Sequence, residues 1–133
     1  MRLELGPETV EALRAHAVRA FPEECCGALL VDAAGTVTAR PLENGAPERR
    51  HGFLVAARDY LSLERDADAR GLALCGFYHS HPDAAAVPSA ADVDAAWPRL
   101  WTVIVPVTAS GAAAPRAFLF DDTTRTFTEG ALP

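Results

Sequence analysis

The chain has 133 residues, of which 50% are hydrophobic and 23% are charged, and its net charge is −6. This length and balance predict one globular domain, residues 1–133, that buries enough apolar surface to fold without disulfides. The acidic balance argues against a general nucleic-acid or anionic-membrane binder, because phosphate binding needs a basic face.

The first half of the chain predicts two helices and three strands. Pro7 fits the first turn of a helix, apolar residues follow at helical spacing as far as Phe21, and Pro22 ends the pattern. A continuous apolar run then predicts a buried strand, a second strand returns after a turn, and a polar loop follows. The ranges are Cys25–Val31 and Thr36–Leu42 for these strands, Glu43–Arg50 for the loop, His51–Val55 for a short strand and Arg58–Arg70 for the second helix.

The second half predicts one short helix among four strands. Pro98 closes this helix, as a proline after the last helical turn commonly does. The irregular alternation of helices and strands predicts an α/β fold with a mixed central sheet flanked by helices. The predicted ranges are Ser89–Trp97 for the helix and Leu72–Tyr78, Trp101–Val107, Arg116–Phe120 and Arg125–Thr128 for the strands, the last of them at an edge.

The sequence also carries signals about the cellular compartment. The segment Met1–Glu8 lacks the apolar core of a signal peptide, and the longest uncharged run is too short to span a bilayer. Three cysteines, Cys25, Cys26 and Cys75, lie in apolar stretches and include no C-x-x-C pair. We therefore expect a cytoplasmic protein whose cysteines are reduced and buried.

Two histidines form the most informative feature of the sequence. His79 and His81 stand two apart in an extended segment, so their imidazoles point the same way while Ser80 points away. Pro82 keeps His81 extended. Catalytic zinc typically uses three protein ligands and leaves a fourth position to water. Asp92, at the start of the predicted helix, is a candidate for the third ligand.

Each half of this pattern also has an ordinary structural explanation. The histidines fit a pair of exposed loop side chains. The stretch from Ser89 to Asp92 fits a capping box, in which a serine and an acid close the first turn of a helix. The two interpretations of this stretch are compatible, because Ser89 can cap the helix while Asp92 turns toward a metal ion.

The joint spacing, HxHP-x6-S-x2-D, is the motif of the JAMM (MPN-plus, Mov34/JAB) metalloprotease family, and the chain matches every fixed position. That family also has a Pro-x-Glu-x-x-Gly segment on its first strand, which the stretch from Pro22 to Gly27 supplies with Glu24. Asn44, in a loop before Phe53, also matches the small standalone bacterial members. The resemblance covers essentially the whole chain and implies a single MPN (JAB)-like domain.

The resemblance implies one zinc ion per chain, held by His79, His81 and Asp92. Glu24 would be the general base that takes a proton from a metal-activated water and passes it to the leaving amine. Ser89 would donate a hydrogen bond to the oxyanion of the tetrahedral intermediate. Without the resemblance, Glu24 would be assigned only to the solvated start of a strand.

The implied activity is a peptidase or isopeptidase that cuts after the C-terminal Gly-Gly of a ubiquitin-like or sulfur-carrier protein. A non-catalytic MPN-type scaffold is the alternative, although such relatives lack part of the ligand set that this chain keeps. A nucleoside deaminase would need His-x-Glu and Pro-Cys-x-x-Cys, and the sequence contains neither. The sequence leaves the identity of the substrate and the oligomeric state open.

The other chemically active side chains are expected to be structural. Glu24 should raise the pKa of the neighbouring thiols, which argues against a cysteine nucleophile. His16 and His51 are expected to be packing or surface residues. Trp97 and Trp101 are expected to belong to the core.

Overall fold

A seven-stranded sheet forms the centre of the fold, and the computed structural model describes all of residues 1–133. Its order is β2-β1-β3-β4-β6-β7, with β5 paired to β4. The β3–β4 pair is parallel and every other pair is antiparallel, which confirms the predicted mixed sheet. The strands are β1 (Cys26–Val31), β2 (Val37–Leu42), β3 (Ala73–Pro82), β4 (Trp101–Thr108), β5 (Gly111–Ala112), β6 (Arg116–Asp121) and β7 (Thr126–Gly130).

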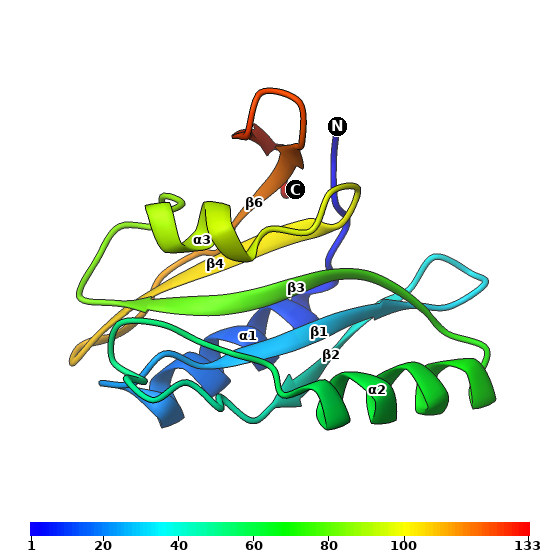
Figure 1. Ribbon diagram of the computed structural model, residues 1–133, viewed down its shortest axis with the longest axis horizontal. Helices are drawn as coiled ribbons and strands as arrows, with labels where there is room; N and C mark the ends of the chain where they lie inside the picture. The colour runs from blue at the N-terminus through cyan, green and yellow to red at the C-terminus, as the bar shows by residue number, and fades with distance from the viewer.

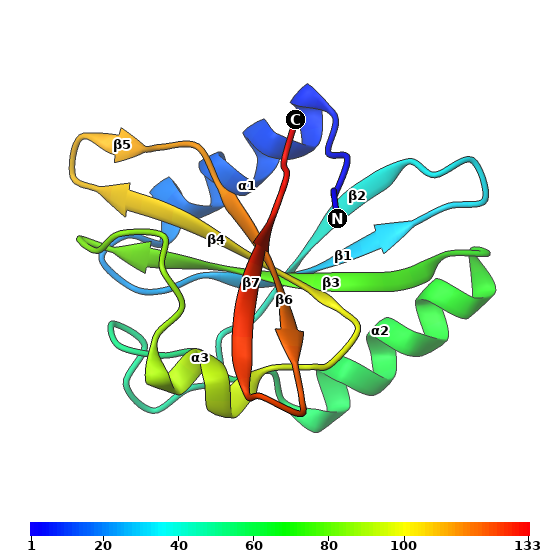
Figure 2. The ribbon, with the colours of Figure 1, turned by 90° about the horizontal axis from the view of Figure 1, so that it is seen from above.

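Three helices flank the sheet: α1 (Pro7–Ala20), α2 (Ala57–Ala69) and α3 (Ala90–Ala95). Figures 1 and 2 show α1 on one side of the sheet and both α2 and α3 on the other. None of the helices combines the length and apolar character needed to cross a bilayer. The predicted arrangement of a sheet flanked by helices is therefore confirmed.

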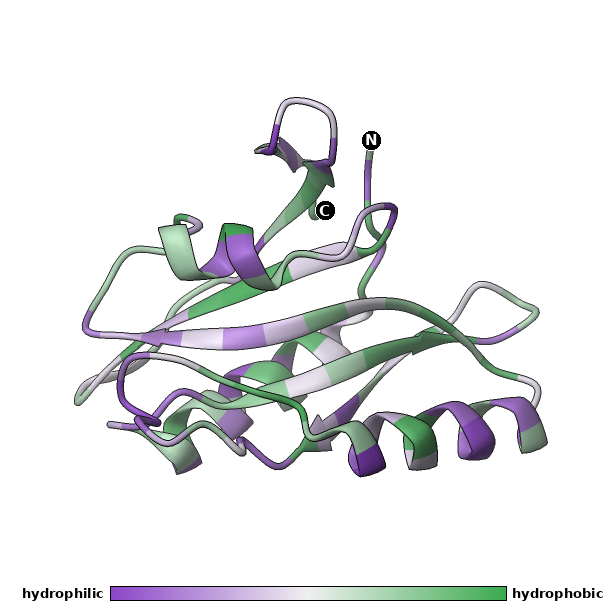
Figure 3. Ribbon diagram, in the orientation of Figure 1, coloured by the Kyte–Doolittle hydropathy of each residue, from purple (hydrophilic) through white to green (hydrophobic).

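Alternation along β3 divides the core into two layers. Tyr78 packs with Leu13 of α1 in the larger cluster, whereas Phe77 packs with Leu63 of α2 in a smaller one. Successive strand residues face opposite sides of a sheet, so both layers are anchored by the same strand. Each fully buried leucine contributes about 2 kcal/mol of apolar burial. In Figure 3, β3 changes from hydrophobic green to hydrophilic purple toward the end that follows these core residues.

Two sequence predictions about this region are wrong. β3 continues for ten residues as far as Pro82, so both histidines lie within the strand and not beyond Tyr78. Continued parallel pairing with β4 carries the strand forward. The predicted strand His51–Val55 is absent, because the polar groups of this segment bond the Asn44 side chain and Gly45 instead of a neighbouring strand.

Candidate metal centre

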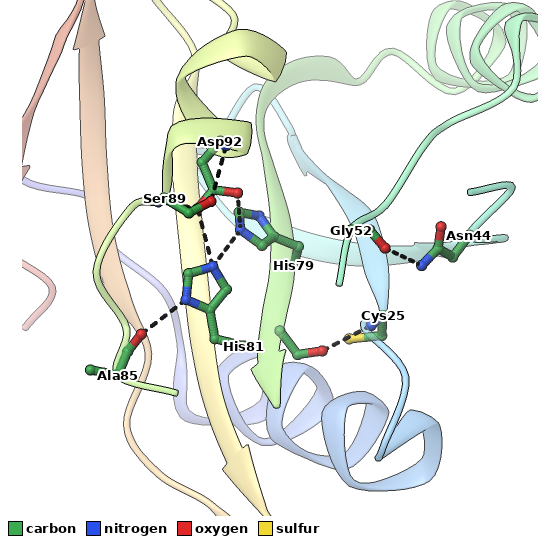
Figure 4. A network of polar contacts seen from close by, with 9 residues as sticks. Cys25, Asn44, Gly52, His79, His81, Ala85, Ser89 and Asp92 are labelled. Carbon is green, nitrogen blue, oxygen red and sulfur yellow. Dashed lines mark hydrogen bonds and ion pairs between the residues drawn. The ribbon is translucent and has the colours of Figure 1, made fainter. Parts of the chain in front are cut away.

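Two elements bring three potential ligands to one point. His79 and His81 project from the same face of β3, and the first turn of α3 carries Asp92 back over the strand (Figure 4). The Asp92 carboxylate lies 3.0 Å from His79 Nε2 and 3.1 Å from His81 Nε2, and the two Nε2 atoms are 3.2 Å apart. All three residues are buried, and one ligand atom from each lies within 4.8 Å of the others. This group could hold a metal ion.

The orientation of His81 suits a metal ligand. Its Nδ1 donates a hydrogen bond to the carbonyl oxygen of Ala85 at 2.9 Å. A carbonyl oxygen only accepts, so Nδ1 carries a hydrogen and Nε2 is the ring atom that faces the cluster. Loss of the Nε2 proton would leave a neutral ring with its lone pair aimed at a metal ion. Burial lowers the pKa of His81, but hydrogen bonds to Asp92 and Ala85 outweigh it and raise the pKa above its ordinary value.

His79 lies deeper than His81, with only 1% of its surface exposed. Burial lowers its pKa despite the nearby Asp92 carboxylate, which favours the neutral imidazole that metal binding requires. Its Nδ1 is buried without a hydrogen-bond partner. The ring of Phe53 lies stacked against it, with centroids 4.5 Å apart.

Asp92 caps α3 and also lies against both histidines. Ser89 Oγ accepts a hydrogen bond from Asp92 N at 3.2 Å, and Asp92 Oδ2 accepts one from Ser89 N at 2.8 Å, which completes a capping box. Burial alone would raise the Asp92 pKa, but hydrogen bonds from His79 and His81 hold it well below its usual range. The carboxylate is therefore ionised, buried and fixed in place.

Glu24 lies two residues before the start of β1, on the face that carries the histidines. Cys26 pairs with His79 in the β1–β3 register. The preceding residue, Cys25, lies opposite Ser80, whose N–H donates to Cys25 O at 3.1 Å. Extending this register by one residue sets Glu24 beside His81. Burial raises the pKa of Glu24 to about 7, opposed by the charge of His81 and assisted by that of Asp92. The half-buried carboxyl thus faces the ligand cluster, more than fifty residues away in sequence.

An apolar pocket of about 550 Å³ opens beside the cluster, and sequence reasoning did not find it. His79 and Asp92 form part of its wall. Its aromatic lining consists of Phe53, Tyr60, Phe77, Trp97 and Trp101. The only signal in the sequence is a run of apolar residues at positions 53–55, which by itself predicts part of a strand.

The expectation that both tryptophans belong to the core is wrong for Trp97. This side chain is 48% exposed and stacks on Tyr60, with centroids 5.4 Å apart. The predicted helix ended at Trp97, but α3 ends at Ala95, and Trp97 follows its C-cap in an irregular segment that lines the pocket. Trp101 is half-buried, packs against the core and also lines the pocket.

The cysteines and remaining histidines agree with their expected structural roles. All three thiols are free, and burial raises their pKa values, to about 12 for Cys26. The charge of Glu24 adds to this effect at Cys26 but is a smaller cause than burial. His16 packs against Tyr78, and His51 is exposed.

The chain is similar in sequence to a known family and to proteins of other prokaryotes. Residues 7–121 match the model of prokaryotic homologues of the JAB domain. The chain is 36% identical over 104 residues to a desampylase of Haloferax volcanii, which covers 73% of this chain and 75% of that protein. It is 32% identical over 114 residues to a probable TtuB-protein conjugate cleaving protease of Thermus thermophilus, covering 85% and 72% of the two chains.

The fold is also found in a solved structure. The protein DSY2949 of Desulfitobacterium hafniense superposes with a TM-score of 0.83 and 28% identity. The match covers 100% of this chain and 92% of that one. The overall fold is therefore shared over the whole length of this chain.

Proposed function

This chain belongs to the family of prokaryotic homologues of the JAB domain, and on that premise we propose that it is a zinc-dependent peptidase of ubiquitin-like proteins. It is a hydrolase of this family. We propose that it cuts the peptide or isopeptide bond after a C-terminal Gly-Gly of a ubiquitin-like or sulfur-carrier protein. The observation that carries the proposal is the convergence of His79, His81 and Asp92 beside a half-buried Glu24.

The metal would be held by His79 Nε2, His81 Nε2 and a carboxylate oxygen of Asp92. Two nitrogens and one oxygen are the donor set of many catalytic zinc sites. The buried, ionised Asp92 offsets part of the ion's charge, and the Ala85 carbonyl orients His81 through its other nitrogen. When bound, zinc activates water toward attack on a carbonyl and polarises that carbonyl.

Glu24 would serve as the general base and then as the general acid. A carboxyl whose pKa lies near 7 exchanges a proton readily at neutral pH. Glu24 stands apart from the three ligand atoms but faces them, so its oxygen can take a proton from the attacking water. The same carboxyl can then return this proton to the leaving amine, which would otherwise depart as an unstable anion.

Ser89 would stabilise the oxyanion that forms on the scissile carbonyl. Its oxygen already accepts a hydrogen bond from Asp92 N, which fixes the side chain at the start of α3. Its O–H makes no hydrogen bond within the chain and is exposed, so it can donate to a substrate atom. A fixed donor aimed at developing charge costs little reorganisation during the reaction.

The relatives and the apolar pocket support the proposed substrate class. A desampylase and a probable TtuB-conjugate protease are named for acting on protein conjugates. A Gly-Gly tail has no side chains to obstruct a narrow approach to the ligand cluster and can extend along backbone groups. The adjoining pocket, lined mostly by apolar side chains, suits apolar residues that precede the glycines.

The test uses zinc-loaded protein and two substrates, a Gly-Gly-tailed prokaryotic ubiquitin-fold protein with a C-terminal extension and the same protein joined to a lysine. Mass spectrometry should locate cleavage after the second glycine. A chelator and Glu24→Gln should each abolish cleavage while circular dichroism shows an intact fold. Full activity of Glu24→Gln would contradict the assigned base. Failure to retain or take up zinc, together with absence of cleavage, would instead favour a non-catalytic scaffold.

A further inference from the structure

We propose that Asn44 is a positioning residue that fixes the main chain of Glu24 and the pocket wall at Phe53 with one side chain. This inference rests on the proposed function, in which Glu24 carries the proton and the pocket receives the substrate. Asn44 contacts neither the ligand cluster nor the pocket directly. Its effect on the reaction would therefore pass through the two segments that it joins.

Both the nitrogen and the oxygen of the Asn44 side-chain amide form hydrogen bonds. Its Nδ2 donates to the carbonyl oxygens of Glu24 at 2.9 Å and Gly52 at 3.0 Å. Its Oδ1 accepts from the amides of Ala46 at 3.0 Å and Leu54 at 3.2 Å. Only a primary amide supplies two donors and an acceptor with two lone pairs in such a small group. Four main-chain groups from three segments thus meet at one side chain. Figure 4 shows one of these bonds, the one to Gly52.

Both main-chain polar groups of Glu24, its N–H and its carbonyl, are hydrogen-bonded. Its N–H donates to Arg49 O at 2.7 Å, and its carbonyl accepts from Asn44. The next amide, Cys25 N, donates to Ser80 Oγ at 2.8 Å. Ser80 sits between the two histidines on the opposite face of β3, so it ties Glu24 to the strand that carries them. These bonds set the direction in which the Glu24 side chain leaves the backbone.

The same amide holds the segment that covers His79. Gly52 O and Leu54 N, the groups that Asn44 binds, flank Phe53 on both sides. Phe53 stacks on His79 and, with Leu54 and Val55, lines the pocket. This segment has no strand partner, so the Asn44 bonds replace the ladder that would otherwise hold it. Loss of the Asn44 side-chain amide should therefore increase the mobility of both Glu24 and the pocket wall at Phe53.

The kinetic test compares Asn44→Ala with Ser80→Ala, because Ser80 holds only the Glu24 side. Asn44→Ala should lower kcat at least about tenfold and raise KM, since a small misplacement of a reacting group is costly. Ser80→Ala should lower kcat and leave KM unchanged, and Ser80→Thr should restore kcat. Asn44→Asp should not restore activity, because it sets a carboxylate against two carbonyl oxygens.

Asp32→Ala is the matched control. Asp32 Oδ1 accepts from the amides of Ala34 and Thr36 in the turn that follows the far end of β1. This variant removes a comparable side-chain clamp and should leave kcat and KM unchanged. Unchanged kcat and KM in a folded, zinc-loaded Asn44→Ala protein would overturn the proposal. An equal loss of activity in Asp32→Ala would also overturn it, because the effect would then reflect general stability.

Amide hydrogen exchange tests the positioning without any substrate. In Asn44→Ala, the Glu24 and Leu54 amides should exchange at least about tenfold faster, whereas amides of β4 such as Val103 should keep their protection. Unchanged protection at Glu24 and Leu54 would overturn the positioning role. Absence of hydrolysis by the wild-type protein would overturn the proposed function, and the exchange result would still decide how Asn44 acts.

Discussion

The phenyl ring of Phe53 lies stacked on the imidazole of His79, with centroids 4.5 Å apart and planes inclined by 23°. His79 is almost completely buried, and its Nδ1 has no hydrogen-bond partner. Most metal-bound histidines are oriented by a hydrogen bond from their second nitrogen. On the proposed function, aromatic packing would take over that task for His79, and Ala85 O would perform it for His81.

Phe53→Ala should therefore weaken zinc binding about tenfold, the lower end of the range for groups that orient a ligand. Competition with a fluorescent zinc chelator measures this change, and Phe53→Leu should recover part of the affinity by restoring apolar cover. Phe127→Ala is the control, because the aromatic partners of Phe127 are Phe118 and Phe120 and not the histidines. Equal zinc affinity in Phe53→Ala and the wild-type protein would refute the orienting role.

Ser89→Gly separates helix capping from oxyanion stabilisation. Glycine at this capping position costs only a few tenths of a kcal/mol relative to serine, whereas alanine costs about 1 kcal/mol. Loss of the hydroxyl donor should lower kcat about 100-fold in both variants. In Ser89→Gly, kcat should therefore fall strongly while the thermal unfolding temperature changes little. Both quantities are measured on the same zinc-loaded samples. A Ser89→Gly protein with wild-type kcat would leave Ser89 with its capping role alone.

Local patterns in the sequence were sufficient for most of the fold. The apolar periodicity from Pro7 to Phe21 and the apolar run from Cys25 to Val31 predicted α1 and β1 to within one residue. The segment at residues 51–55 misled the prediction because its apolar character reflects the lining of a pocket and not a place in the sheet. Pairing partners decide whether such a run becomes a strand, and they are distant in sequence.

Some residues of the candidate site could likewise be predicted from local sequence patterns, and others could not. The i, i+2 rule placed His79 and His81 on one face, and the capping pattern placed Asp92 at the start of α3. Glu24 depends on the β1–β3 register, which no local spacing encodes, and only the family motif indicated it. The side-chain bonds of Asn44 and Ser80 were beyond prediction, because they join main-chain groups of separate segments.

Trp97 provides a test of the pocket. Trp97→Ala removes a half-exposed indole that stacks on Tyr60 at the pocket rim. We expect KM for the Gly-Gly-tailed substrate protein to rise about tenfold and kcat to change little. Aromatic anchors commonly contribute more than about 1 kcal/mol to binding. Steady-state kinetics measure both constants. Leu119→Ala, a half-buried substitution in β6 outside the pocket, should leave KM as it is. A fall in kcat alone would place Trp97 in the chemistry and not in binding.

His16 should make stability depend on pH independently of the metal centre. Its Nδ1 lies 2.7 Å from the hydroxyl of the fully buried Tyr78. Burial, assisted by the charge of Arg19, lowers the pKa of His16 below its ordinary value of 6.5. As the pH falls through 6.5, the unfolded chain takes up a proton that the folded chain resists, so the free energy of unfolding falls. The contribution of His16 is thus present above pH 6.5 and is lost as the pH falls toward the lowered pKa.

Urea unfolding of chelated protein at pH 5.0 and 7.5 measures this effect by comparison with His16→Asn. Asparagine keeps an acceptor near the Nδ1 position for the Tyr78 hydroxyl but does not titrate, so the wild-type protein should lose more stability than the variant at the lower pH. His16→Leu should cost about 1–3 kcal/mol at pH 7.5, because the buried hydroxyl then lacks a partner, and less at pH 5.0, where the wild-type protein has lost part of the His16 contribution. Parallel pH dependence of the wild-type protein and His16→Asn would show that His16 does not titrate in this range.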